Sequence, residues 1–195
     1  MPILDINNTE IVYHSDFPNN NQIRNLEVGA SRNCFGKKYY PSCYLTDLTE
    51  PSYPHFYGLV DYSENNSHFL DHIGDFYDLQ LDRDFDLTIF CNPYGFGFRG
   101  KENSKKFLNK SGQVLSEGGQ ILILGNKAND WSKYENAEKW LNRLNEEQML
   151  DYNLELSPLT EIDENHIYRT NHVFRKMTVD EPTIVHEMYR IVKIN

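Results

Sequence analysis

The stretch from Asn25 to Asn33, Asn-Leu-Glu-Val-Gly-Ala-Ser-Arg-Asn, predicts a short buried strand that ends in a glycine turn. Leu26 and Val28 are the apolar residues of this strand, and Gly29 begins the turn. Small residues let the backbone come close to a bound group, because a longer side chain would fill the gap. Glu27 adds a carboxylate that can accept hydrogen bonds from amine or hydroxyl groups. Short glycine patterns also recur by chance, so the alternative is a strand with an ordinary turn.

Length and composition are those of one globular domain. The chain has 195 residues, of which 39% are hydrophobic and 13% aromatic, enough for a full core. The net charge of -10 argues against broad binding to nucleic acid or to an anionic membrane. No apolar run approaches the roughly 20 residues that span a bilayer, and no signal peptide is evident. With three cysteines in no metal-type spacing, we expect free thiols, no metal site and a cytoplasmic protein of bacterial type.

Hydrophobic periodicity predicts alternating strands and helices after a polar, Asn-rich N-terminal extension over residues 1–24. Residues 25–195 form the predicted domain. Two nearly continuous apolar runs are typical of parallel strands buried on both faces. A glycine pair at 118–119 ends the first long helix, and Asn129-Asp130 is the expected N-cap of the second. Strands are predicted at 26–28, 43–47, 85–91, 120–124 and 152–156, helices within 67–73, 104–115 and 131–144, and alternating edge-type β structure at 169–177 and 183–194.

Two further acidic residues, Asp47 and Asp75, are candidates for ligand binding. Asp47 ends the second strand, where a carboxylate in an open parallel sheet can accept both hydroxyl protons of a ribose. The alternative is that Asp47 only caps the following turn. Asp75 and Phe76 together suit a purine, with the acid near the exocyclic amine and the ring against its face. The alternative there is a surface loop with one buried Phe.

A segment rich in Asn, Gly and aromatic residues follows the clearest strand. Ligands bind off the carboxyl ends of strands in such sheets, so this segment is a pocket candidate. Asn92 offers a donor and an acceptor, and Tyr94 and Phe96 offer flat faces. The glycines Gly95 and Gly97 favour a mobile loop. The competing interpretation is a glycine turn whose aromatic side chains belong to the core.

The order of these segments resembles a small class I S-adenosylmethionine-dependent methyltransferase, from about residue 25 to the end. The segments that carry the resemblance are 26–31, Asp47, 74–76, 85–89 and Val-Leu-Ser-Glu-Gly-Gly-Gln-Ile-Leu at 114–122. The resemblance implies a Rossmann-like α/β fold. Its sheet would be mostly parallel and seven-stranded, with the last strand antiparallel and helices on both faces. The tail would supply the closing hairpin.

The resemblance also implies S-adenosylmethionine as cofactor and a position for each part of it. Glu27, Gly29 and Ser31 match the segment that faces the methionine part, Asp47 matches the ribose-binding acid, and Asp75 with Phe76 matches the adenine segment. Asn92, with Pro93 and Tyr94, stands where adenine- and glutamine-methylating members carry Asn-Pro-Pro-Tyr. One Pro is absent, so that substrate class is not inferred. Tyr94, Phe96 and Asn126 would lie near the substrate. Ser31 and Asn33 replace the usual second and third glycines.

Two functions of different class follow. The first is methyl transfer from S-adenosylmethionine to a small-molecule or peptide acceptor, favoured because all three acids are present. The alternative is a catalytically inactive protein of this fold that binds a protein partner, such as an immunity protein that neutralises a toxin through its acidic surface. The altered glycine segment favours that alternative. Neither function involves a membrane or requires nucleic acid.

Overall fold

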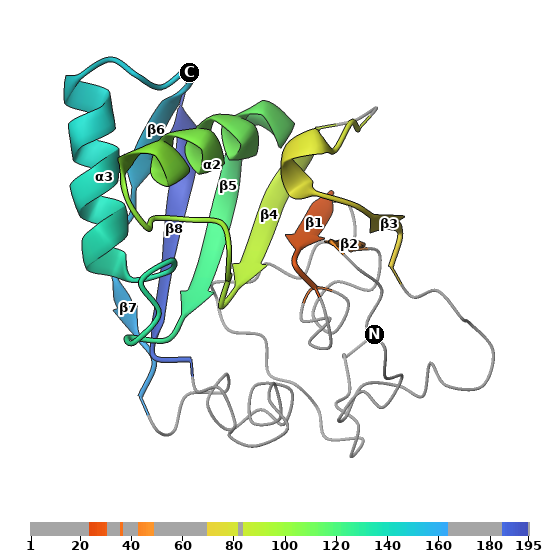
Figure 1. The fold of residues 1–195 in the computed structure, drawn as a ribbon, viewed down its shortest axis with the longest axis horizontal. Coiled ribbons are helices and arrows are strands. Elements are labelled where there is room, and N and C mark those ends of the chain that lie inside the picture. Colours follow the sequence, from red (N-terminus) through yellow and green to blue (C-terminus); the bar gives the residue numbers. More distant parts are fainter. Residues whose placement is uncertain are drawn as a thin grey trace.

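A single β-sheet forms the centre of the molecule (Figure 1). The computed structural model describes residues 24–30, 36, 43–48, 70–81, 84–163 and 185–194. The sheet has eight strands in the order β3-β2-β1-β4-β5-β8-β6, with β7 paired to β8 off this path. The strands are β1 (Asn25–Val28), β2 (Tyr44–Asp47), β3 (His72–Ile73), β4 (Phe85–Cys91), β5 (Leu115–Gly125), β6 (Asn153–Leu156), β7 (Thr160–Glu161) and β8 (Glu187–Ile194).

Strand directions confirm the predicted fold class. The strands from β3 through β2, β1 and β4 to β5 are all parallel to their neighbours. The last strand, β8, runs antiparallel to both β5 and β6. The expectation of an edge strand over 183–194 is wrong, because β6 pairs with the second side of β8 and encloses it. Two short strands among the described residues, β3 and β7, were not predicted as strands.

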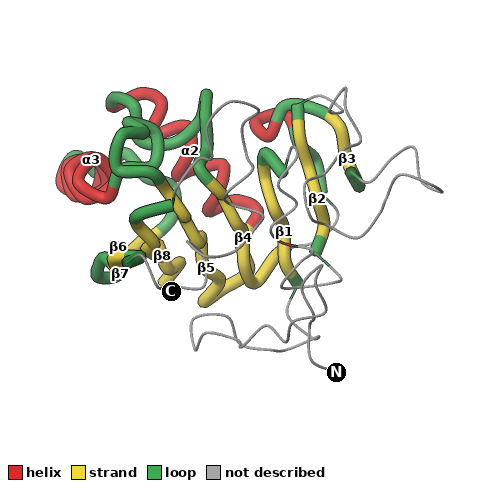
Figure 2. The backbone as a smooth tube through the Cα atoms, turned by 90° about the horizontal axis from the view of Figure 1, so that it is seen from below, coloured by secondary structure: helices red, strands yellow, loops and turns green. Residues whose placement is uncertain are grey.

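The long helices α2 (Lys101–Val114) and α3 (Tyr134–Glu146) lie on the same side of the sheet (Figure 2). Gly36 is helical and contacts Glu27 from the opposite face. A short 3-10 helix, η1 (Phe76–Asp78), follows β3. Within the described part of the chain, neither helix has the length and apolar character that crossing a membrane requires.

Several predicted boundaries are wrong for local reasons. The first long helix ends at Val114, where β5 begins at once, so the glycine pair at 118–119 lies inside the strand. The second begins at Tyr134 after the N-cap residue Lys133, because Asn129 and Asp130 belong to the preceding turns. Residues 72–73, predicted as helix, form β3. The strand predicted at 169–177 and the residues of the 1–24 extension before Arg24 lie outside the described residues.

Alternation along the strands divides the sheet into two buried faces. Leu26, Val28 and Phe90 belong to the core cluster beneath α2 and α3. Glu27 and Ile89, which pair in register, are fully buried on the other face. The Phe90 ring meets a ring of α2 edge-on, with 4.8 Å between centroids. Burial on both faces explains the continuous apolar runs of β4 and β5.

Two side chains of β8 fix the ends of the long helices. The Lys193 ammonium donates to the carbonyls of Gly112 at 3.2 Å and Leu115 at 2.9 Å, where α2 ends. A cation at a helix C-terminus also interacts favourably with the helix dipole. The buried Glu187 accepts a hydrogen bond from the first N–H of α3, with 3.0 Å between N and Oε2. The Tyr189 hydroxyl donates to the Ser132 carbonyl at 2.8 Å.

Asp86 forms a polar cluster at the amino end of β4. Its carboxylate accepts from the Arg24 N–H at 2.9 Å and from the Ser116 hydroxyl at 2.7 Å. The Arg24 guanidinium lies 3.2 Å from Asp86 Oδ1, the oxygen that also accepts from the Ser116 hydroxyl. Burial raises the pKa of the Asp86 carboxyl, but the hydrogen bonds from Arg24 and Ser116 outweigh burial, so the net pKa is lowered.

Candidate functional site

The carboxyl ends of five parallel strands meet at one edge of the sheet (Figure 1). The last residue of β1 pairs with Thr46, so Gly29 lies level with Asp47. The Gly74 N–H donates to the Asp47 carbonyl at 2.8 Å, which brings Asp75 to the same edge. Register therefore places the glycine turn and two predicted acids side by side.

Glu27 is fully buried on the face opposite α2. Its Oε2 accepts a hydrogen bond from the Gly36 N–H at 2.7 Å. A Cβ at Gly36 would lie 3.0 Å from that same oxygen and 2.5 Å from Cys43 Sγ, so the backbone approaches very closely here. Glu27 therefore fixes the position of the Gly36 backbone. Its predicted contact with cofactor is untested, and Ser31 lies outside the described residues.

The two acids after β2 and β3 each bond to the local backbone through one oxygen. Asp47 Oδ1 accepts from the Leu48 N–H at 2.6 Å, as the turn-capping alternative predicts. Asp75 Oδ1 accepts from the Tyr77 N–H at 2.9 Å and so caps η1. A carboxylate has about four acceptor sites, so the bond to Tyr77 does not use all that Asp75 can accept. Asp75 is exposed and Asp47 is half-buried.

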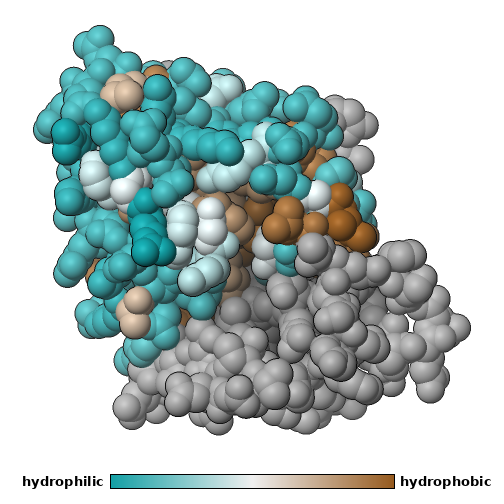
Figure 3. Space-filling model, viewed as in Figure 1, coloured by the Kyte–Doolittle hydropathy of each residue, from teal (hydrophilic) through white to brown (hydrophobic). Residues whose placement is uncertain are grey.

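Apolar side chains flank these acids. Leu48, directly after β2, is 64% exposed and Ile73 in β3 is 46% exposed. Figure 3 shows apolar surface on the β3 side of this face, beside the grey atoms. Exposed apolar side chains next to polar hydrogen-bonding groups are typical of ligand sites. Sequence analysis did not single out Leu48 or Ile73, although each stands next to a predicted site segment.

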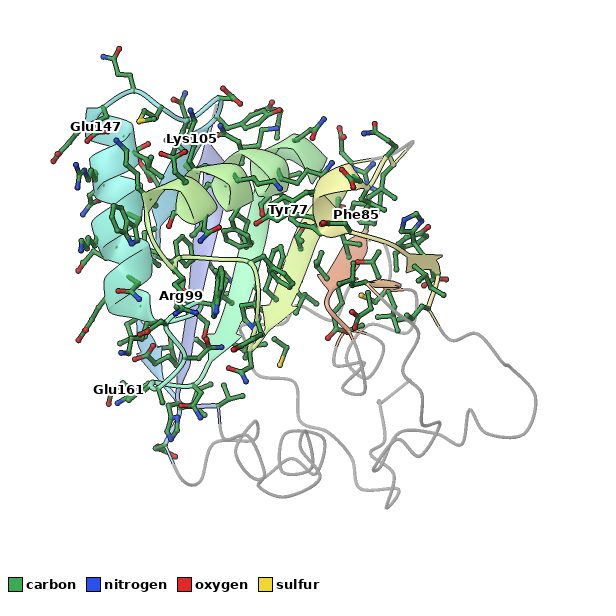
Figure 4. All side chains as sticks on the ribbon, in the orientation of Figure 1. Tyr77, Phe85, Arg99, Lys105, Glu147 and Glu161 are labelled. Carbon is green, nitrogen blue, oxygen red and sulfur yellow. The ribbon has the colours of Figure 1, made fainter. Side chains whose placement is uncertain are left out.

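Phe76 belongs to the core, as the alternative of one buried Phe predicts. Its side chain lies in the cluster beneath α2 and meets the Phe90 ring edge-on, at 5.5 Å between centroids. Tyr77 points from η1 toward α2 (Figure 4), and the Lys106 ammonium lies 3.8 Å from its ring centroid. Burial and the nearby Asp75 carboxylate raise the pKa of Tyr77 to about 12. Its phenol is therefore protonated at neutral pH and is not a general base.

Phe96 lies between Gly29 and the Phe76 ring of η1. A Cβ built on Gly29 would be 3.0 Å from Phe96 Cζ, so the ring touches this glycine. The same ring is 6.3 Å from the Phe76 ring and 5.6 Å from the Phe90 ring. Phe96 is half-buried and packs against the core, as the competing interpretation of its loop predicts.

Asn92 joins the loops that follow β4 and β5. Its backbone adopts a left-handed conformation with φ of 46°, and its N–H donates to the Leu124 carbonyl at 2.6 Å. Its Oδ1 accepts from Asn129 Nδ2 at 2.8 Å, and the same Nδ2 donates to the Pro93 carbonyl at 2.8 Å. Asn129 is thus a cross-link between two loops. The sequence offered no signal for this role, since the partner is 37 residues away.

A second cross-link involves Gly97 and Trp131. The Phe98 N–H donates to the Trp131 carbonyl at 2.8 Å. Gly97 has φ of 121°, and a Cβ there would lie 2.3 Å from the same carbonyl oxygen. The Gly97 backbone packs directly on the loop after β5. The close approach requires a residue without a side chain.

Aromatic and cationic side chains form the outer surface of these joined loops. Tyr94 is 82% exposed, and its ring centroid lies 6.3 Å from that of Trp131. The Arg99 guanidinium lies 5.6 Å from the same indole ring, on the loop that joins β4 to α2 (Figure 4). Asn126 follows β5 and accepts the Ala128 N–H at 2.8 Å. Over the described ranges, no group of three or more His, Cys, Asp or Glu is placed to hold a metal ion.

Known structures share this architecture, although the sequences have diverged. An S-adenosylmethionine-dependent methyltransferase from Mesorhizobium loti matches 91% of this chain and 94% of its own, at 11% identity and a TM-score of 0.56. The N-methyltransferase NodS from Bradyrhizobium japonicum WM9 matches 89% of this chain and 87% of its own, at 14% identity and a TM-score of 0.54. A second structure of NodS, in complex with S-adenosyl-L-homocysteine, matches 89% of this chain and 79% of its own, at 13% identity and a TM-score of 0.52.

Sequence comparisons alone do not reveal this likeness. No protein-family model matches the chain, and no curated protein sequence matches it. None of the structural matches described above supports the toxin-neutralising alternative. Strand order, the antiparallel β8 and the structural matches agree: this chain has the fold of the class I S-adenosylmethionine-dependent methyltransferases.

Proposed function

We propose that this protein binds S-adenosylmethionine at the carboxyl edge of β1, β2 and β3 and transfers its methyl group to a small-molecule or peptide acceptor. The observation that carries the proposal is the register that brings Gly29, Asp47 and Asp75 to one edge. This is the edge at which ligands bind in open parallel sheets. The NodS structure in complex with S-adenosyl-L-homocysteine lends support through the shared fold.

The residues at this edge fit an adenosyl group. Asp47 is proposed to accept from the two ribose hydroxyls, as carboxylates can, and Asp75 from the exocyclic amine of adenine. The exposed Leu48 and Ile73 offer apolar surface to the purine. The Phe76 side chain is buried in the core beneath this segment, so its ring is not exposed for stacking on the base. Glu27 maintains the turn through Gly36, and Ser31 is proposed to face the methionine part of the cofactor.

The sulfonium supplies a reactive methyl group, so that attack by the acceptor forms the new bond while the carbon–sulfur bond breaks and leaves a neutral thioether. The protein's task is then to hold the two reactants in line. Tyr94, Asn126 and the adjoining Trp131 are proposed to orient the acceptor, since they stand on the joined loops after β4 and β5. The Phe96 ring touches Gly29, so it separates the proposed cofactor-binding edge from the loops proposed to bind the acceptor.

Titration calorimetry with S-adenosyl-L-homocysteine tests the proposal. Asp47→Asn keeps an oxygen for the Leu48 N–H but removes the charge. Hydrogen bonds to a charged group contribute about 1.5–3 kcal/mol, so this variant should bind about 10–100-fold more weakly than the unaltered protein. Asp84→Asn is the matched control, because Asp84 precedes β4 at the opposite edge of the sheet.

The proposal predicts a saturable heat signal that Asp47→Asn weakens and Asp84→Asn leaves unchanged. Absence of heat with the unaltered protein at high concentration would contradict cofactor binding. Equal affinities in all three proteins would show that the ligand binds away from Asp47.

A further inference from the structure

The side chain of Phe96 occupies the space in front of Gly29. A Cβ built on this glycine would lie 3.0 Å from Phe96 Cζ and 3.6 Å from Cε1. Gly29 has φ of 70°, a conformation that glycine adopts without strain. The gap left by the absent side chain is therefore filled by the protein itself, at the point where the methionine part of the cofactor is expected.

Three rings hold Phe96 in this position. Phe90 on β4 meets it edge-on at 5.6 Å, and Phe107 on α2 stacks against it at 6.5 Å with 19° between the ring planes. Phe76 on η1 lies 6.3 Å away. These contacts favour the observed rotamer over one that points away from Gly29, because offset and edge-to-face aromatic pairs are attractive.

The backbone around Phe96 is fixed on one side and open on the other. On the C-terminal side, Gly97 packs on the Trp131 carbonyl, and the next N–H bonds to the same oxygen at 2.8 Å. On the N-terminal side, a Cβ at Gly95 would meet no atom within 4 Å. A movement of Phe96 away from Gly29 would therefore meet less resistance from the backbone at residue 95 than from the Gly97–Trp131 contact.

We propose that Phe96 sets the affinity of the site for the amino-acid part of the cofactor, because its ring must turn away from Gly29 before that part binds. The inference rests on the proposed function. It assigns Phe96 a role distinct from acceptor binding. If the protein is in its open state in about one molecule in ten, the ligand binds about tenfold more weakly than it would to a protein that is always open.

The test compares two ligands and three variants by titration calorimetry. S-adenosyl-L-homocysteine carries the amino-acid part, whereas 5′-methylthioadenosine lacks it. Phe96→Leu removes the ring atoms Cε1 and Cζ that touch Gly29 but keeps an apolar side chain in the cluster. Phe96→Ala removes the whole ring. Asp84→Asn is the control, since Asp84 precedes β4 at the opposite edge of the sheet.

The proposal predicts that both Phe96 variants bind S-adenosyl-L-homocysteine more tightly, on the order of tenfold, with 5′-methylthioadenosine unaffected and Asp84→Asn unchanged for both ligands. Unchanged or weaker binding of S-adenosyl-L-homocysteine by Phe96→Leu would overturn it and leave the proposed function standing. Equal gains for both ligands would also overturn it, because the ring would then block the adenosine part. If no protein binds either ligand, both the inference and the proposed function fail.

Discussion

Gly97→Ala should destabilise the protein more than Gly95→Ala, although both glycines lie in one loop and have positive φ. Their φ angles are 121° and 91°, respectively, so an alanine at either position carries backbone strain of about 1–3 kcal/mol. Only at Gly97 would the new Cβ meet another backbone, 2.3 Å from the Trp131 carbonyl oxygen. Gly95→Ala is therefore a matched control that isolates the contact between the two loops.

The magnitude of the difference follows from that contact. Overpacking against a backbone that cannot yield easily costs about 1–3 kcal/mol. Displacing the Trp131 carbonyl also weakens the 2.8 Å hydrogen bond from Phe98, which contributes about 0.5–1.5 kcal/mol. Gly97→Ala should therefore lose about 1.5–4.5 kcal/mol more than Gly95→Ala. Urea unfolding followed by circular dichroism measures both free energies, and equal losses would refute the packing of the two loops.

Three further perturbations test the supports of the sheet. Tyr189→Phe removes the buried donor to the Ser132 carbonyl and should lower the free energy of unfolding by about 1 kcal/mol, whereas an unchanged urea midpoint would contradict that bond. Lys193→Met keeps the aliphatic stem but removes two charged hydrogen bonds at the end of α2, so about 1.5–3 kcal/mol should be lost in the same assay. The pKa of Asp86 is lowered on folding, so its stabilising contribution is present above the unfolded pKa of about 4 and is lost as pH falls through the folded value. The stability difference between the unaltered protein and Asp86→Asn should therefore shrink below pH 4, and a difference independent of pH down to 2 would refute the pairing with Arg24.

Period and composition were enough to predict the central strands, because their signals are local. β4 and the second half of β5, residues 121–124, are nearly continuous apolar runs, as expected for strands buried on both faces. The role of β8 was harder to predict, since an alternating pattern does not reveal that a second strand covers its outer edge. Pairing between strands distant in the sequence depends on topology that no single segment encodes.

In the candidate site too, local features could be predicted from the sequence, whereas contacts between distant segments could not. Gly29 and Asp47 could be placed at one edge from the predicted strands, and the register agrees. Asp75 could not, because β3, which brings it there, was predicted as helix. Asn129 was interpreted as a helix cap because Asn is common there, yet its side chain cross-links two loops. The contact between Phe96 and Gly29 joins residues 67 positions apart. The domain limits, the bacterial origin and the cytoplasmic location remain predictions.

Hydrogen exchange with saturating S-adenosyl-L-homocysteine tests the central claim most directly, because it reports where the ligand binds. The claim is that an adenosyl group lies across the carboxyl ends of β1, β2 and β3. It predicts slower amide exchange in peptides that cover residues 24–30, 43–48 and 70–81, with exchange in β6 and β7 unchanged. Protection confined to other segments, or no protection at saturation, would contradict it.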